Sequence, residues 1–320
     1  MVVNPFLSRS FFRKLSQCLG VVIFFYVFGL EKLHGQGVGL PSKYWGIGFG
    51  NLREFSGLRF NFRDSGIREI NGINITLWQP KKDNSQAVVT GLSLGLMPGG
   101  GTMRGVQIGV LGVAAERDVR GISIGLLGVG CGGDMVGVNI GGLGAGAGGS
   151  VRGLNVGLLG VGAGENLEGI NIGGLGGGAG GDVKGLNVGL LGMGAGKRLM
   201  GLTVAGLGAG AGEILKGITI CGLGAGAPTI RGVTIAGLGV GGVDVKGVTL
   251  AFGMIKIEDD GKLSGFSASA CNYVKGTQEG ISIGIFNYAF RLRGIQIGLI
   301  NIVRDNPKAL RVLPIFNANF

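Results

Sequence analysis

A repeating pattern of apolar, polar and glycine positions runs through the middle of the chain. From Met103 it recurs every sixteen residues, and after Leu215 every fifteen. The third residue of each unit is glycine, and an aliphatic, an uncharged polar and a second aliphatic residue follow it. A glycine-rich run completes the unit, as in VRGLNVGLLGVGAGEN at 151–166. A fixed period of this kind indicates a series of repeated supersecondary units.

Charged residues in the repeats lie only at the unit boundaries, so each unit contains ten or eleven uncharged residues in a row. We interpret each unit as an extended apolar segment that ends in a short polar turn, such as Gly181-Asp182. The flanks also predict strands, because Leu58, Phe60 and Phe62 alternate with polar residues. Glycine, at 73 of 320 residues, disfavours helix. The predicted fold class is therefore all-β.

Two architectures fit these strands, and the pattern favours an antiparallel outer-membrane-type β-barrel of about 16–18 strands built from 14–16-residue repeats. Eleven extended residues, tilted by about 45°, cross roughly 25 Å of membrane. Alternation of Leu-Leu with Gly-Leu, as at Leu158-Leu159 and Gly174-Leu175, suggests strand pairs. The aromatic segment that ends at Phe320 resembles the closing strand of such barrels.

The alternative is a β-solenoid with one unit per coil. The apolar residues change phase within a unit, from even numbers at Leu154 and Val156 to odd numbers at Val161. A corner near Gly157 would return both sets to a dry core, whereas a straight strand would place them on opposite faces. Boundary turns of equal length also favour coils, because membrane barrels alternate short and long loops.

The chain divides into four segments. Arg9, Arg13 and Lys14 precede an apolar run at 19–30, which is typical of a signal peptide and too short to span a bilayer as a helix. We therefore expect a signal peptide at 1–36 and export of the remainder. N-terminal β-strands at 37–102, the glycine-rich repeats at 103–250 and C-terminal β-strands at 251–320 follow.

The polar position between the two aliphatic residues is the candidate functional column. In a barrel its side chains would face the lumen, and in a solenoid they would form an external ladder that binds a partner or water. Simple polar alternation of an amphipathic sheet is the competing interpretation. The column consists of Gln107, Ser123, Asn139, Asn155, Asn171, Asn187, Thr203, Thr219, Thr234 and Thr249.

The sequence predicts no catalytic, cofactor-binding or metal site, and no enzyme activity. The single histidine, His34, lies in the predicted signal segment. Cys131, Cys221 and Cys271 stand where other repeats have Ala or Gly, which indicates small apolar residues. G-x-G-x-x-G matches are expected by chance at this glycine content. The net charge of +11 comes without a basic run, so nucleic acid is not an expected partner.

Several segments resemble a family of bacterial surface repeat-containing proteins of spirochaetes and Bacteroidetes-type bacteria. They are GLRFNFRD (57–64), INGINITLW (70–78), the GLGAGAG repeats, GISIGIFNYAFRLRGIQIGLINIVRDNP (280–307) and LRVLPIFNANF (310–320). The resemblance implies an exported protein of the outer membrane or cell surface without an assigned activity.

The predicted function is that of an envelope component, either a barrel acting as a pore or structural element, or a surface-attached or secreted solenoid with an adhesive or structural role. Outer-membrane lipid is the expected partner. The pattern specifies no protein or glycan partner.

Overall fold

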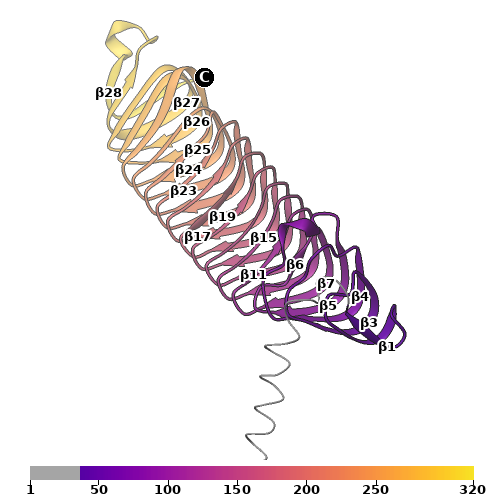
Figure 1. The fold of residues 1–320 in the computed structure, drawn as a ribbon. Helices are drawn as coiled ribbons and strands as arrows, with labels where there is room; N and C mark the ends of the chain where they lie inside the picture. The colour runs from indigo at the N-terminus through magenta and orange to yellow at the C-terminus, as the bar shows by residue number, and fades with distance from the viewer. Residues whose placement is uncertain (1–36) are drawn as a thin grey trace, which may run out of the picture.

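The computed structural model describes residues 37–320. These residues form an all-β solenoid of about 15 turns with no α-helix. Figure 1 shows the coils stacked in chain order, from β1 (Val38–Pro41) at one end to β28 (Val312–Asn319) at the other. The predicted signal peptide lies outside the described residues. At about 4.8 Å per coil, the stack is roughly 70 Å long.

Each regular coil contains one long and one short strand. Within the repeats the long strands are β7 (Thr102–Gly109), β9 (Val119–Gly125), β11 (Met135–Gly141), β13 (Val151–Gly157), β15 (Leu167–Gly173), β17 (Val183–Gly189), β19 (Arg198–Ala205), β21 (Ile214–Cys221) and β23 (Thr229–Ala236). The short strands are β6 (Gly99–Gly100), β8 (Gly112–Ala115), β10 (Gly128–Cys131), β12 (Gly144–Ala147), β14 (Gly160–Ala163), β16 (Gly176–Ala179), β18 (Gly192–Ala195), β20 (Gly208–Ala211) and β22 (Gly224–Gly226).

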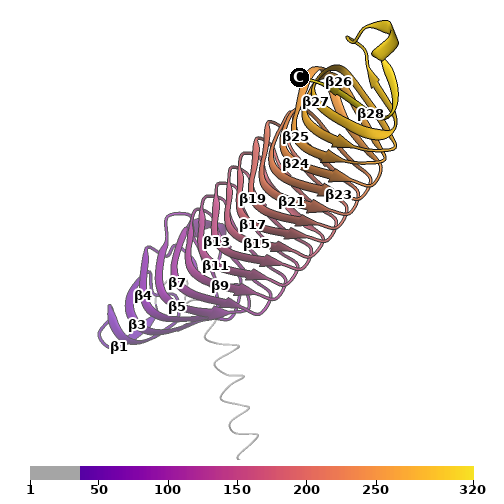
Figure 2. The same ribbon diagram turned by 180° about the vertical axis from the view of Figure 1, so that it is seen from behind.

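The terminal coils extend the same sheet, as the view from behind in Figure 2 also shows. The N-terminal part contains β2 (Trp45–Phe49), β3 (Glu54–Asn61), β4 (Glu69–Thr76), the 3-10 helix η1 (Lys82–Asn84) and β5 (Val88–Gly95). The C-terminal part contains β24 (Gly239–Ala251), β25 (Met254–Ala268), β26 (Cys271–Ile283), β27 (Phe286–Val303) and the 3-10 helix η2 (Lys308–Leu310).

Coils pair in parallel and in register, so equivalent residues of successive units lie side by side. Val151 pairs with Leu167 and Asn155 with Asn171, for example. Antiparallel pairing occurs only at the two ends of the described chain, between β1 and β2 and between β27 and β28. The predicted antiparallel barrel is therefore wrong, and the solenoid alternative describes the fold. The aromatic C-terminal segment does not close a barrel; it folds back on β27 and covers the end of the stack.

Position 3 of each unit places a bend in the long strand. Coil positions are counted from the first residue of a unit, so Val151 is position 1 and Asn166 is position 16. Gly153 has φ +115°, and a Cβ there would collide with the carbonyl oxygen of Gly137 in the preceding coil. Glycine is therefore required both for the backbone conformation and for the close approach of coils.

The interior combines an apolar core with a polar column. Val151 at position 1 and Val161 at position 11 are buried and belong to one continuous hydrophobic cluster. Asn155 at position 5 is also buried, whereas Leu154 and Val156 point outward and are only half-buried. The expectation that a corner near Gly157 returns both apolar sets to the core is therefore wrong. Side chains fill the coils, so the described residues do not form the lumen that a pore requires.

Candidate functional surface

The predicted polar column lies inside the solenoid. All ten of its residues, from Gln107 to Thr249, are at most 2% exposed. The prediction of an external ladder is therefore wrong, and so is the interpretation as the solvent-facing side of an amphipathic sheet. In register, the column continues to Arg59, Asn74 and Ser93 at one end and to Ser267, Ser282 and Gln296 at the other.

The asparagines of this column form a hydrogen-bonded ladder. Asn139 donates to Asn155, Asn155 to Asn171, and Asn171 to Asn187, each from Nδ2 to Oδ1 at 2.9 Å. Ser123 donates to Gln107 at 2.8 Å. These hydrogen bonds link the column from coil to coil, although Gln107 Nε2, Asn139 Oδ1 and Thr234 Oγ1 have no partner among the described residues. Because its side chains are buried and bonded to one another, the column is a structural element rather than a binding surface.

Sequence reasoning missed a second internal ladder in the C-terminal coils. Asn272 donates to Asn287 at 2.7 Å, and Asn287 donates to Asn301 at 2.8 Å. All three side chains are fully buried. The recurrence of Asn at intervals of fifteen and fourteen residues was the signal that could have identified this ladder.

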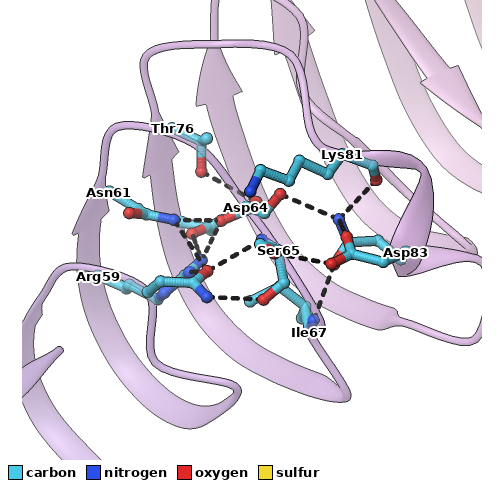
Figure 3. Close-up of polar contacts among 11 residues, drawn as sticks. Arg59, Asn61, Asp64, Ser65, Ile67, Thr76, Lys81 and Asp83 are labelled. Atoms are coloured by element: carbon cyan, nitrogen blue, oxygen red, sulfur yellow. Dashed lines mark hydrogen bonds and ion pairs between the residues drawn. The ribbon is translucent and has the colours of Figure 1, made fainter. Parts of the chain in front are cut away.

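A buried ion pair lies at the N-terminal end of the polar column (Figure 3). Arg59 contacts Asp64 at 2.8 Å and donates to Asn74 Oδ1 at 2.8 Å. Asn61 and Thr76 also donate to the Asp64 carboxylate, at 2.7 and 3.2 Å. Burial lowers the pKa of the Arg59 guanidinium, and the neighbouring carboxylate opposes that effect. Because Arg59 is 0% exposed, the cluster has no surface for a substrate and completes the interior at this end.

The aliphatic residues that sequence reasoning placed in the core form the outer surface. They occupy positions 4, 6, 8 and 9, and we call this surface the aliphatic face. Leu126, Leu158 and Leu190, all at position 8, are 66–67% exposed. Other exposed members in the repeats are Ile108, Val110, Ile122, Ile124, Leu127, Ile140, Leu143, Leu159, Ile170, Ile172, Leu175, Leu191, Leu202, Val204, Leu207, Ile218, Ile220, Leu223 and Leu238.

The aliphatic face is larger than the apolar patches of ordinary monomers. It continues into both flanks, where Phe62, Trp78 and Phe252 are exposed. A strip roughly 70 Å long and about 13 Å wide covers on the order of 900 Å². The largest apolar patch of a typical monomer covers about 300–600 Å², and larger ones mark interaction sites.

A column of mostly basic side chains borders this face at position 2. The residues pair in register from coil to coil, and we call them the basic column. Eight are cations, two are carboxylates, and Val136, Met200 and Ser264 between them are uncharged. The cations are Arg104, Arg120, Arg152, Lys184, Lys216, Arg231, Lys246 and Arg293, and the carboxylates are Glu168 and Glu279.

Most other carboxylates of the repeats lie in the boundary turn, on the other side of the basic column from the aliphatic face. Lys184 contacts Asp182 at 3.1 Å, and Arg152 contacts Glu168 at 3.4 Å. Arg198 also donates to Asp182, and this hydrogen bond lowers the pKa of that carboxyl. The Arg152–Glu168 and Arg198–Asp182 pairs connect successive coils, whereas Lys184 and Asp182 are two residues apart in the chain. The exposure of the basic side chains to solvent limits what each pair contributes to stability.

Nothing in residues 37–320 forms a group of three or more His, Cys, Asp or Glu side chains that could hold a metal ion. Cys131, Cys221 and Cys271 are free thiols. Cys221 belongs to the hydrophobic cluster and Cys131 packs against it. The placement of Cys131 and Cys221 agrees with the prediction that they are small apolar residues.

The described residues contain no helix that is long and apolar enough to cross a membrane. Comparison of the chain with protein-family models, with curated proteins and with solved structures found no match.

Proposed function

We propose that this protein is an exported, surface-attached scaffold of the bacterial envelope with a structural or adhesive role. The observation that carries the proposal is the aliphatic face, which leaves side chains such as Leu158 two-thirds exposed. A solenoid of this length presents the face as one rigid strip, because each coil is fixed to its neighbours by a parallel sheet. The scaffold acts by attachment and carries out no catalytic step.

Two sequence features support the location. The charged segment and apolar run within residues 1–36 have the pattern of an export signal. The resemblance to bacterial surface repeat proteins covers most of residues 50–320. Neither feature depends on whether the chain forms a barrel or a solenoid.

Cell fractionation tests the proposal. We expect the protein in the envelope fraction, accessible to added protease in intact or osmotically opened cells. We also expect extraction by urea or alkaline washing, because a peripheral protein is held by one surface. Recovery in the cytoplasm, inaccessible to protease, would contradict the proposal.

A further inference from the structure

We propose that the aliphatic face rests on the surface of an anionic lipid bilayer, with the basic column at the level of the headgroups. This inference rests on the proposed function and names the partner of the same surface. It follows from the order of side chains around each coil, from the position of the cations and from two grooves in the C-terminal coils.

The aliphatic face is uncharged across the width that would enter the bilayer. Leu154, Val156 and Leu158 follow the basic position in their coil, and the short strand after them contains no charge. Amphipathic helices at membrane interfaces bury their apolar face about 5–10 Å deep, at the boundary between headgroups and acyl chains, and we expect a similar depth for this face. Strands can lie there without breaking hydrogen bonds, because each backbone is already paired with the neighbouring coils.

The basic column has the position that an anionic surface requires. Position 2 is two residues before position 4 on the same strand, or about 7 Å along it. Lys and Arg side chains are long enough to reach phosphates at that distance while the aliphatic residues enter the acyl region. Arg104, Lys216 and Lys246 form no ion pair with any residue of 37–320, so their charges are available to lipid.

A polar groove lies within the basic column near the C-terminal end. It has a volume of about 490 Å³ and is lined by Arg231, Asp244, Lys246, Lys262, Ser264 and Glu279. Lys262 is paired with Glu279 at 2.7 Å and Arg231 lies 3.9 Å from Asp244. Lys246 remains the free cation of this groove within the described chain, and a phosphate headgroup would supply its partner.

An apolar hollow of about 350 Å³ opens in the same coils. Ile235, Leu250, Phe252, Ala268 and Ala270 contribute to its lining. It forms where Ser269-Ala270 replaces the bulky corner residues of other coils, and Phe252 beside it is 86% exposed. A lipid acyl chain has the shape and polarity to fill this hollow.

The charge distribution distinguishes lipid from a second copy of the chain. Two aliphatic faces packed together would bury the leucines but would leave Arg104, Lys216 and Lys246 without anionic partners. A bilayer rich in anionic lipid accommodates both features, so the observations favour the bilayer.

Vesicle co-sedimentation with residues 37–320 tests the inference. This part contains a complete core and has antiparallel strands at both ends, and it lacks the apolar run at 19–30. We expect binding to vesicles with about a third phosphatidylglycerol, weaker binding to phosphatidylcholine alone, and a decrease at high ionic strength.

Two variants separate the contribution of the aliphatic face to vesicle binding from that of the basic column. Leu126→Asn/Leu158→Asn/Leu190→Asn should weaken binding to both vesicle types at least tenfold. Arg104→Gln/Lys216→Gln/Lys246→Gln should weaken binding to anionic vesicles about tenfold or more and reduce the salt dependence. The matched control Lys82→Gln/Lys197→Gln/Lys308→Gln removes three cations elsewhere and should bind like the unchanged protein.

Tryptophan fluorescence gives a readout that needs no variant. Trp78 is exposed at the corner of the aliphatic face, and Trp45 lies in register with the basic column. Lipids brominated on the acyl chain should quench the fluorescence on binding. Vesicle binding without quenching would place the contact elsewhere and overturn the inference.

The remaining outcomes are also decisive. A dimer in light scattering that ignores vesicles would identify a second copy as the occupant and overturn the inference. Envelope association in cells without vesicle binding would reject the lipid partner and leave the scaffold function standing. A cytoplasmic location would reject the scaffold function itself, whatever the vesicles do.

Discussion

Asn155 donates a hydrogen bond from its side-chain amide to Oδ1 of Asn171 in the next coil, at 2.9 Å. Both side chains are fully buried. The bond is one step of a ladder that runs parallel to the solenoid axis, so each asparagine holds the coil before it and the coil after it. Polar groups inside the stack thereby fix the register of the coils.

Replacing Asn171 with Ala should therefore destabilise the protein by about 2–4 kcal/mol, because it leaves a donor on Asn155 and an acceptor on Asn187 buried without their ladder partners. Urea unfolding followed by circular dichroism measures the change. Ser56→Ala on the exposed surface is the control and should change stability by less than about 0.5 kcal/mol. A similarly small effect at Asn171 would mean that the ladder does not stabilise the stack.

Thr234 lies in the same column and should behave in the opposite way. Its hydroxyl is buried and has no hydrogen-bond partner. Thr234→Val keeps the shape and removes an unsatisfied polar atom, so we expect unchanged or increased stability, by up to about 1 kcal/mol. The same urea experiment measures it, and a loss of more than about 1 kcal/mol would show that the hydroxyl is paired in solution.

The sequence predicted the β class and the recurrence of the polar column, but it favoured the barrel over the solenoid. The equal length of the boundary turns correctly indicated a solenoid, because parallel coils of equal length bring Asn155 and Asn171 into register. The barrel interpretation gave more weight to the aromatic end at Phe320 and to the Leu-Gly alternation. That alternation lies at position 8, where Leu158 is exposed and Gly174 approaches the carbonyl oxygen of Leu158.

The sequence did not reveal which side of the long strand faces inward. Alternation places Leu154 and Asn155 on opposite faces but does not say which is buried, and an apolar core was the natural assumption. The coil is narrow, and Val151 and Val161 already fill the apolar part of its interior. Asparagine can occupy the remainder because its amide pairs with the next coil. The basic column, in contrast, could have been identified from the sequence, because Lys and Arg predominate at position 2 of the units.

Two glycines of one coil should respond differently to the same substitution. Gly153→Ala introduces a side chain at φ +115° against the carbonyl oxygen of Gly137, whereas a Cβ at Gly162 meets nothing within 4 Å. We expect Gly153→Ala to cost about 3 kcal/mol or more, or to prevent folding. Gly162→Ala should be neutral or slightly stabilising. The midpoints of thermal unfolding of the two variants are compared. Equal midpoints would contradict the close contact between the position 3 glycines of successive coils.

The thiol of Cys131 should react slowly in the folded protein. Burial is the main cause that raises its pKa from 9.0 to about 11, so at pH 8 the folded state holds roughly one hundredth of the thiolate that the unfolded chain holds. In Cys221→Ala/Cys271→Ala protein, alkylation by iodoacetamide should be far slower in buffer than in urea. The raised pKa means that the folded state favours the protonated thiol. Protonated Cys131 therefore contributes fully to the stability of the fold below pH 9, and this contribution is lost as the pH rises through 11. Equal alkylation rates in buffer and urea would contradict the burial.

The Arg59–Asp64 pair provides the last prediction. Arg59→Met leaves the Asp64 carboxylate buried with only Asn61 and Thr76 as side-chain donors, and we expect a loss of about 3–5 kcal/mol. Arg59→Met/Asp64→Asn removes both charges and should recover a large part of that loss, since an isolated buried charge is the main cost. Arg68→Met breaks the exposed pair with Glu54 and should cost no more than about 1 kcal/mol. Urea unfolding of the three proteins gives the comparison. If the double variant is no more stable than Arg59→Met, the hydrogen bonds to Asn74 and its neighbours, rather than the charge pair, hold this end of the solenoid together.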